Sequence, residues 1–218
     1  MEKIFFSILL FIIINCISLL FQKKASIKGE NIKIIRNNNF NYGKLPDSIQ
    51  DITSNFSRFS YISDIVIKVY ILIYIGAVIN SNQPYEIFYH TLIMISLILF
   101  FRVIMFSSTI LPSINVNCHI KKKKIYKKPF STLIFDFITQ KYNIGYCNDY
   151  IFSGHNAIYL LLTLMILYYK LLPYTVSILL CSSTILFSLF TIMCRNHYTI
   201  DIILAYFITF SIFTMYYK

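Results

Sequence analysis

Six long apolar segments are the feature of this sequence that most constrains its fold. The hydrocarbon core of a bilayer is about 30 Å thick, and an α-helix needs roughly 20 residues to cross it. Runs close to that length cover residues 4–21, 62–79, 87–110, 154–169, 174–193 and 198–217. None of these runs shows the alternation of barrel strands, and only helices or closed barrels satisfy their backbone inside lipid. The sequence therefore predicts an all-α, polytopic membrane protein: one domain of six transmembrane helices, without a separate soluble domain.

The composition agrees with a membrane protein and excludes a soluble one. Hydrophobic residues make up 57% of the 218 residues and charged residues only 13%, which a soluble domain of this size does not tolerate. The first apolar run is long for a signal peptide and no small-x-small cleavage site follows it, so we expect it to be retained. The lysine cluster of Lys121 to Lys124, with Lys127 and Lys128, could hold anionic lipid headgroups, at about 1 kcal/mol per residue near the surface. We expect no nucleic-acid partner.

The number of crossings gathers the polar motifs on one face of the membrane. Two successive helices return the chain to the side that it left, so the loops 22–61 and 111–153 and the short turn around His197 share a face. The opposite face receives the two termini and the short links "NSNQPYE" and "KLLPY". Ionisable residues that border membrane spans are costly, and their convergence favours a site at the membrane interface.

Histidine and carboxylate residues on this face fit phosphoryl transfer. His197 and Asp201 have i, i+4 spacing, so they share a helical face if a helix begins at or just before His197. A carboxylate that orients one ring nitrogen leaves the other as a nucleophile. His155, at the start of the fourth segment, can protonate a departing alkoxide. The helix N-terminus that follows Ser153 and Gly154 suits a phosphoryl group.

Plain structural roles for the same residue types stay open at this point. A lone histidine at a helix end is more often a solvated interfacial residue than a catalyst, and H-x-x-x-D arises often by chance. Asp149 can simply cap the turn before the fourth helix. Arg102 can extend to lipid headgroups instead of binding a substrate.

Four blocks of the sequence, in order along the chain, resemble the sphingomyelin synthase family, which is related to the lipid phosphate phosphatases of the type 2 phosphatidic acid phosphatase superfamily. The family's C-G-D-x-x-x-S-G-H-T block is similar to residues 147–156, "CNDYIFSGHN". Its H-Y-T-x-D-x-x-x-A-Y block is matched at every position by residues 197–206. An R-x(6)-T-x-L-P element resembles residues 102–112, and a P-L-P-D element resembles "KLPD" at residues 44–47.

The sequence departs from these patterns at defined positions. Asn148 stands where the family has glycine and Asn156 where it has threonine, so the packing at the mouth of the fourth helix is expected to differ. The K-x(6)-R-P motif of the phosphatases is not found upstream. Arg195 lies two residues before His197, which is not the phosphatase spacing. The missing phosphatase motif and the position of Arg195 weaken simple hydrolysis as the expected reaction.

The resemblance implies a reaction and a set of site residues. It implies transfer of phosphocholine or phosphoethanolamine from phosphatidylcholine or phosphatidylethanolamine to ceramide, with release of diacylglycerol and without a metal or cofactor. His197 would attack the donor phosphorus, Asp201 would assist it, and His155 would act as acid and then as base. The residues that it assigns to substrate binding are Arg102, Asp149, Ser153, Gly154 and Tyr198.

Two other functions remain open. A lipid phosphate phosphatase would use both histidines and release inorganic phosphate from a lipid phosphomonoester. A non-catalytic lipid-binding or transporter-like protein would have the same apolar frame and basic rim, without needing His155, His197 and Asp201 together.

The charge distribution and the resemblance disagree on orientation. Seven basic residues lie in each of the segments 23–58 and 121–141, whereas the opposite face has only Lys3, Lys170 and Lys218. This bias places the large loops in the cytosol. The family's orientation places the site on the lumenal or outer face, and we follow the family, with residence in the Golgi, the secretory pathway or the plasma membrane. On that face Cys118 and Cys147 could form a disulfide.

Overall fold

The structure is a computed structural model, and it describes residues 2–36, 45–109, 111 and 151–218. Asp149, Asn148 and the cysteines at 118 and 147 lie outside the described residues, so the predictions that concern them stay predictions.

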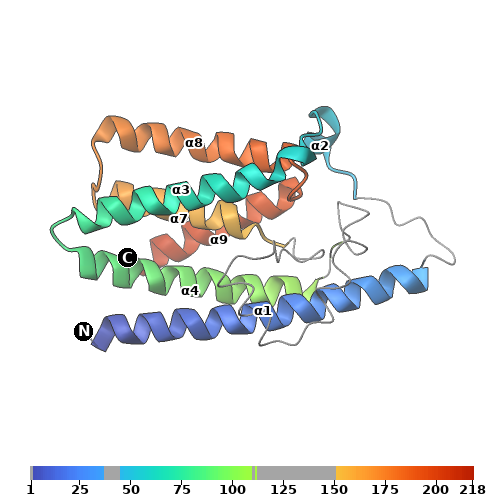
Figure 1. The fold of residues 1–218 in the computed structure, drawn as a ribbon, viewed down its shortest axis with the longest axis horizontal. Helices are drawn as coiled ribbons and strands as arrows, with labels where there is room; N and C mark the ends of the chain where they lie inside the picture. Colours follow the sequence, from blue (N-terminus) through green and yellow to red (C-terminus); the bar gives the residue numbers. More distant parts are fainter. Residues whose placement is uncertain (1, 37–44, 110, 112–150) are drawn as a thin grey trace.

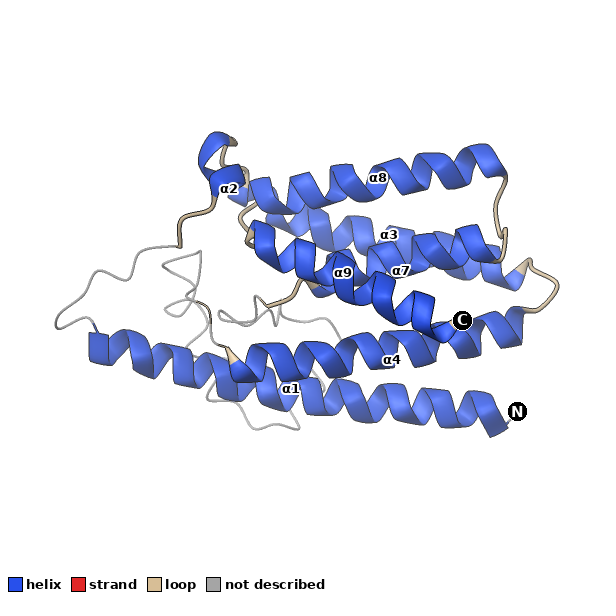
Figure 2. Ribbon diagram, turned by 180° about the vertical axis from the view of Figure 1, so that it is seen from behind, coloured by secondary structure: helices blue, strands red, loops and turns tan. Residues whose placement is uncertain are grey.

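The described residues form helices and connecting loops, with no strand among them (Figure 2). In the described part of the chain, five helices are long and apolar enough to cross a membrane, namely α1 (Glu2–Arg36), α3 (Ser60–Ile79), α4 (Pro84–Ser108), α8 (Tyr174–Met193) and α9 (Thr199–Tyr216). A shorter apolar helix, α7 (Gly154–Tyr168), comes between α4 and α8 in the chain. The prediction of an all-α membrane fold is confirmed, and the chain is an integral membrane protein.

Helix α7 is the centre of the bundle. It contacts α3, α4, α8 and α9, and it lies among them in Figure 1. Its side chains are buried on several sides, and those that have no more than 2% of their surface exposed include Ala157, Leu161, Leu162, Met165 and Ile166. A helix that is apolar all round and enclosed by other helices is a core element. This explains how α7 can be only 15 residues long, about 22 Å, although the bilayer core is about 30 Å thick.

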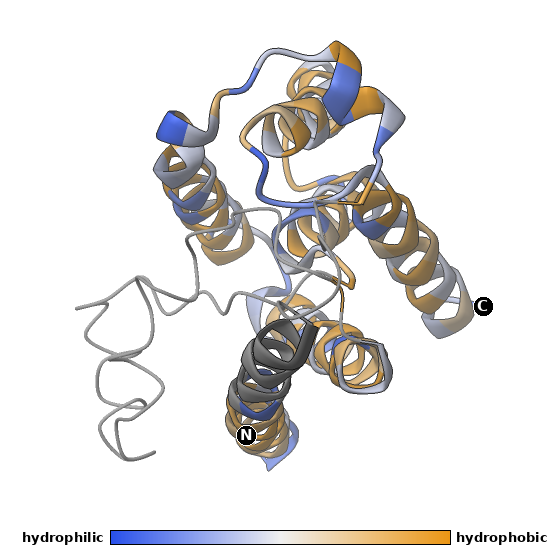
Figure 3. Cartoon of the chain, turned by 90° about the vertical axis from the view of Figure 1, so that its right-hand side faces the viewer, coloured by the Kyte–Doolittle hydropathy of each residue, from blue (hydrophilic) through white to orange (hydrophobic). Residues whose placement is uncertain are grey.

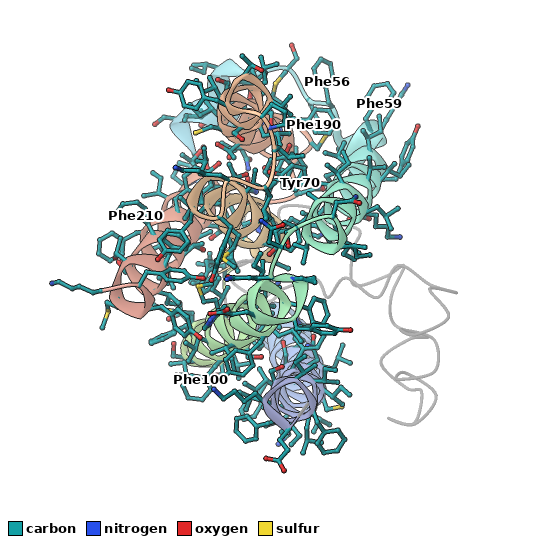
Figure 4. All side chains as sticks on the ribbon, turned by 90° about the vertical axis from the view of Figure 1, so that its left-hand side faces the viewer. Phe56, Phe59, Tyr70, Phe100, Phe190 and Phe210 are labelled. Carbon is teal, nitrogen blue, oxygen red and sulfur yellow. The ribbon has the colours of Figure 1, made fainter. Side chains whose placement is uncertain are left out.

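The outer helices present apolar side chains outward. Phe100 of α4 and Phe210 of α9 are 50% and 56% exposed, and Figure 4 shows them pointing away from the bundle. Tyr70 of α3 instead points inward, where it is 3% exposed and its ring stacks on that of Tyr159. Apolar surface on the outside of a helical bundle is the arrangement that lipid requires.

Helix α1 is longer than the sequence analysis predicted. The apolar run ends near residue 21, but the helix continues to Arg36 and packs along α4 (Figure 1). Thirty-five residues of helix span about 52 Å, well beyond the bilayer core. The predicted loop 22–61 is therefore helical over its first part, where the sequence contains no proline to stop the helix. It also contains the short helices α2 (Ser48–Ile52) and η1 (Ser57–Phe59).

One end of the bundle carries the polar motifs. Helix α2, the turn between α8 and α9, the start of α7 and the end of α4 lie at this end, and the α3–α4 and α7–α8 links lie at the other (Figure 1). Viewed from the α2 end, polar stretches in the links stand out against the apolar helices (Figure 3).

We predict that the two ends of the bundle are on opposite sides of the membrane. In a variant without native cysteines, a cysteine at Asn82, in the α3–α4 link, and one at Ile52, at the end of α2, should react with a membrane-impermeant thiol reagent from opposite sides. Both native positions are exposed, so neither site should be blocked by the fold. Reaction of both from one side would contradict the crossing of α3 between them.

Candidate active site

His197 and Asp201 lie together at the start of α9. Helix α9 begins at Thr199, one residue after the start at 198 expected from the sequence, and His197 belongs to the preceding turn. The contact forms nevertheless: Nδ1 of His197 is 3.5 Å from Oδ2 of Asp201. That oxygen also accepts a 2.9 Å hydrogen bond from the backbone N–H of Tyr198. Asp201 is fully buried and His197 is 6% exposed, so the carboxylate is held in place beneath the ring.

His155 has a carboxylate partner that the sequence analysis did not identify. Its Nε2 is 3.1 Å from Oδ1 of Asp64, which lies in the second turn of α3. Both side chains remain partly exposed, at 43% and 31%. A signal for Asp64 was present, since it is the only acidic residue in the apolar run 62–79 and a carboxylate in such a run is costly.

The start of α7 is shaped by Ser153 and Gly154. Ser153 is the N-cap of α7, and its hydroxyl accepts a hydrogen bond from the backbone N–H of Asn156. Because Ser153 is fully buried, its hydroxyl serves the helix and does not point outward. The Arg102 guanidinium lies so close to Gly154 that an added Cβ would be 3.2 Å from its Cζ atom. A side chain at this position would require the guanidinium to move by a few tenths of an ångström.

Arg102 is turned toward α7. Its Nε donates a 3.1 Å hydrogen bond to the carbonyl of Phe152, just before the α7 N-cap. The sequence left two roles open for Arg102, contact with lipid headgroups and substrate binding. In the structure Arg102 lies at the mouth of α7, where its charge is close to the backbone N–H groups of the first turn. Both are favourable surroundings for an anion.

Asn156 joins α7 to α8 beneath the histidines. Its amide nitrogen donates to the hydroxyls of Ser153 at 2.9 Å and Thr191 at 3.1 Å, and its oxygen accepts from Ser188 at 2.8 Å. Ser188 is in turn 2.6 Å from the hydroxyl of Tyr206 on α9. A threonine hydroxyl has a single proton, so it could not donate to Ser153 and Thr191 at once as this amide does. The departure from the family pattern at Asn156 thus has a defined structural role.

Tyr198 is placed away from any open surface. Only 2% of it is exposed, and its hydroxyl accepts a hydrogen bond from the backbone N–H of Leu45 at 3.3 Å. It is the residue before α9, and its own N–H is held by Asp201. The structure therefore gives Tyr198 a place in the packing of the turn, and its predicted contact with substrate stays a prediction.

The two histidine segments are joined directly. The backbone N–H of Ser153 donates to the carbonyl oxygen of Asp201 at 3.1 Å, which ties the start of α7 to the start of α9. His155 follows Ser153 by two residues, and Asp201 contacts His197. In the described part of the chain no group of three or more His, Cys, Asp and Glu residues comes together to hold a metal, and the metal-free reaction remains a prediction.

One comparison with known proteins covers the part of the chain that carries these residues. Residues 146–218 match the family model described as PAP2 superfamily C-terminal. The matched segment contains α7, α8 and α9, and with them both histidines and Asp201. No curated protein matches the chain significantly. The match supports a membrane enzyme of the lipid phosphatase and phosphotransferase class, and it does not distinguish the sphingomyelin synthases within that superfamily.

We predict different effects for two glycine substitutions. Gly154→Ala must displace the end of the flexible Arg102 side chain by a few tenths of an ångström, so it should stabilise the protein less than Gly76→Ala does. Gly76→Ala, in α3, meets no atom within 4 Å and should stabilise the helix by about 0.5–1 kcal/mol. The thermal unfolding midpoint in detergent micelles measures both. A Gly154→Ala midpoint at or above that of Gly76→Ala would contradict the close approach.

Proposed function

We propose that this protein is a lipid phosphotransferase that moves a phosphocholine or phosphoethanolamine group from a glycerophospholipid to ceramide and releases diacylglycerol. The observation that carries the proposal is the pairing of each histidine with a carboxylate, His197 with Asp201 and His155 with Asp64, at one end of a membrane helix bundle. The PAP2 match over the segment that contains both histidines supports the reaction class. The choice of ceramide rests on the sequence blocks that resemble the sphingomyelin synthases.

The first half of the reaction breaks the bond between phosphorus and the diacylglycerol oxygen. Nδ1 of His197 faces Asp201, so Nε2 is the proposed nucleophile and forms a new bond to phosphorus. The Asp201 carboxylate stabilises the positive charge that develops on the ring. His155, in its protonated form, gives a proton to the departing oxygen. The products of this half are diacylglycerol and a phosphorylated His197.

The second half returns the group to a lipid. His155, now neutral, takes the proton of the ceramide primary hydroxyl, and that oxygen attacks phosphorus while the bond to His197 breaks. Both histidines are restored to their starting protonation states. Because Asp64 contacts Nε2 of His155, we propose that Asp64 orients this ring in both halves and that Nδ1 carries the proton.

Arg102 is proposed to bind the phosphate. It lies against the first turn of α7, beside the backbone N–H groups of that turn. A guanidinium and a helix N-terminus together stabilise the charge on the two non-bridging oxygens of the transferring group.

Hydrolysis of a lipid phosphomonoester is the second candidate, and the PAP2 match favours it equally. Water would then replace ceramide in the second half, and the same residues would act. An experiment separates the two. The protein, reconstituted in vesicles that contain labelled ceramide with phosphatidylcholine or phosphatidylethanolamine, should give a labelled phosphosphingolipid identified by mass. Release of inorganic phosphate from phosphatidic acid, without a labelled phosphosphingolipid, would identify a phosphatase. If neither product forms, the result would favour a non-catalytic lipid-binding protein.

Substitution of His197 tests the nucleophile. His197→Ala should abolish transfer, because no phosphoenzyme can form, and Asp201→Asn should leave a residual rate lowered by about 10²–10⁴-fold, because the imidazole survives without its orienting charge. His90→Gln is a matched control, since His90 lies in the first two turns of α4, away from the site. Turnover by His197→Ala at the wild-type rate would refute the mechanism.

Substitution of Asp64 tests the second pair. Asp64→Asn should slow both the release of diacylglycerol and the transfer to ceramide, because His155 acts in both. Single-turnover measurements with labelled donor resolve the two halves. A rate unchanged in both would show that the Asp64 contact has no role in the reaction.

A further inference from the structure

Residues 45–56, here named the strap, lie across the turn that carries His197. The strap contains α2 and sits at the end of α8 in Figure 1. Its backbone is bonded to the turn at both ends: the N–H of Leu45 donates to the Tyr198 hydroxyl, and the N–H of Phe56 donates to the carbonyl of Met193 at 2.9 Å. A segment that is separated from the turn by more than a hundred residues of chain is thus fastened on either side of it.

Asp47 caps two helices with one carboxylate. Its Oδ1 accepts from the backbone N–H of Gln50 at 3.1 Å, as the N-cap of α2, and from the Thr199 hydroxyl at 2.7 Å. Its Oδ2 accepts from the backbone N–H of Thr199, the first residue of α9, at 2.6 Å. Three donors therefore converge on a carboxylate that is 8% exposed. An asparagine could not replace it, because its amide nitrogen cannot accept a hydrogen bond.

The ionised form of Asp47 is the one that this arrangement favours. Burial raises the pKa of the Asp47 carboxyl, but the hydrogen bonds from Thr199, Gln50 and Ile49 outweigh burial and leave the pKa below its usual value. The cap is then fully formed above the ordinary titration range of an aspartate, and it is lost only as the pH falls through the lowered pKa.

Gln50 holds the backbone of His197 itself. Its Nε2 donates to the carbonyl of His197 at 2.9 Å, and the Gln50 side chain is fully buried. His197 is therefore fixed from two directions, with its ring against Asp201 and its carbonyl against the strap.

Arg195 fastens the turn to the strap at the cost of an unfavourable backbone conformation. Helix α8 ends with the paired hydrogen bonds of a Schellman motif, in which Arg195 has a φ of 59°. Glycine is the usual residue there. The Arg195 side chain donates from Nη2 to the carbonyl of Thr53 at 2.9 Å. Lys170 ends α7 in the same way, with a φ of 51°, at the opposite end of the bundle.

We propose that the strap is a positioning element for His197, and that Asp47 is its central residue. Asp47 acts through Thr199, and Gln50 through the His197 carbonyl, so neither is assigned a contact with the substrate. The inference rests on the proposed function, in which His197 attacks phosphorus. Attack requires the reacting atoms at about 3–3.5 Å with aligned orbitals, and a displacement of about 1 Å can lower the rate by about 10²-fold.

Asp47→Asn tests the proposal, and Asp51→Asn is its matched control. Both substitutions remove one negative charge from the same short helix, but the Asp51 side chain is exposed. With the protein reconstituted in vesicles, we expect Asp47→Asn to lower kcat by about tenfold or more and to leave KM within about twofold. Asp51→Asn should keep both constants. Equal kcat values for the two variants would overturn the proposal.

Amide hydrogen exchange tests the same contact without relying on activity. In Asp47→Asn, the peptide that spans residues 196–201 should exchange faster, because the N–H of Thr199 loses its acceptor, whereas peptides from α7 and from the far end of α9 should keep the wild-type rate. Faster exchange throughout the protein would indicate general destabilisation and would overturn a positioning role. Wild-type exchange at 196–201 would overturn it as well.

Arg195→Gly and Lys170→Gly form a second matched pair. Both relieve the left-handed backbone, but only Arg195→Gly removes a bond to the strap. We expect Arg195→Gly to lower kcat relative to Lys170→Gly, although both variants should raise the unfolding midpoint or keep it. Equal kcat values would overturn the positioning role of the strap.

If wild-type protein transfers nothing to ceramide, the proposed function fails while the exchange result still stands. If wild type transfers and Asp47→Asn does so equally, only the strap inference fails.

Discussion

The fully buried carboxylate of Asp201 is the junction on which the site depends. Its side chain faces His197 and accepts from the N–H of Tyr198, and its backbone carbonyl accepts from the N–H of Ser153, two residues before His155. One residue thus fixes the start of α9 and ties it to the start of α7. A buried carboxylate is costly unless it is bonded or paired. Its place in the first turn of α9, where the helix dipole is positive, lowers that cost.

Polar groups within the bundle are arranged so that few of them meet lipid. Asn156, Thr191, Ser188 and Tyr206 form a continuous set of hydrogen bonds from α7 through α8 to α9. Tyr70 and Thr163 make a similar bond between α3 and α7, at 2.7 Å. In a bilayer the folded helices cannot rely on the hydrophobic effect to associate, so tight packing and interhelical hydrogen bonds have a larger share in holding the bundle. The same bonds fix the position of α7 relative to α3, α8 and α9.

The local features of the fold could be predicted from the sequence, and the distant contacts could not. Apolar runs indicated the helices, because a membrane span has a fixed length. The H-x-x-x-D spacing indicated the contact of His197 with Asp201, because the two residues are four apart across the start of α9. Asp64 approaches His155 from a helix about ninety residues earlier in the chain, and no spacing rule encodes such a contact. The strap escaped prediction for the same reason: the "KLPD" resemblance singled out Asp47, but its partner Thr199 is set by tertiary packing. Helix α1 continued past its apolar run since hydropathy marks the end of a span and not the end of a helix.

The proposed reaction also explains why two separate histidine–carboxylate pairs would be useful. Transfer between two lipids exchanges one primary alkoxide for another, so the second half is chemically the reverse of the first, and the group that protonates the leaving oxygen must deprotonate the entering one. His155 suits that alternation because it and Asp64 remain partly exposed, whereas His197 and Asp201 are buried. His197 must instead keep one orientation through both halves, and its surroundings are correspondingly fixed, with Asp201 buried beneath the ring and Gln50 on its carbonyl. The exposed pair exchanges protons and the buried pair holds the phosphorus: in this scheme the difference in burial between the two histidines follows from the difference in their tasks.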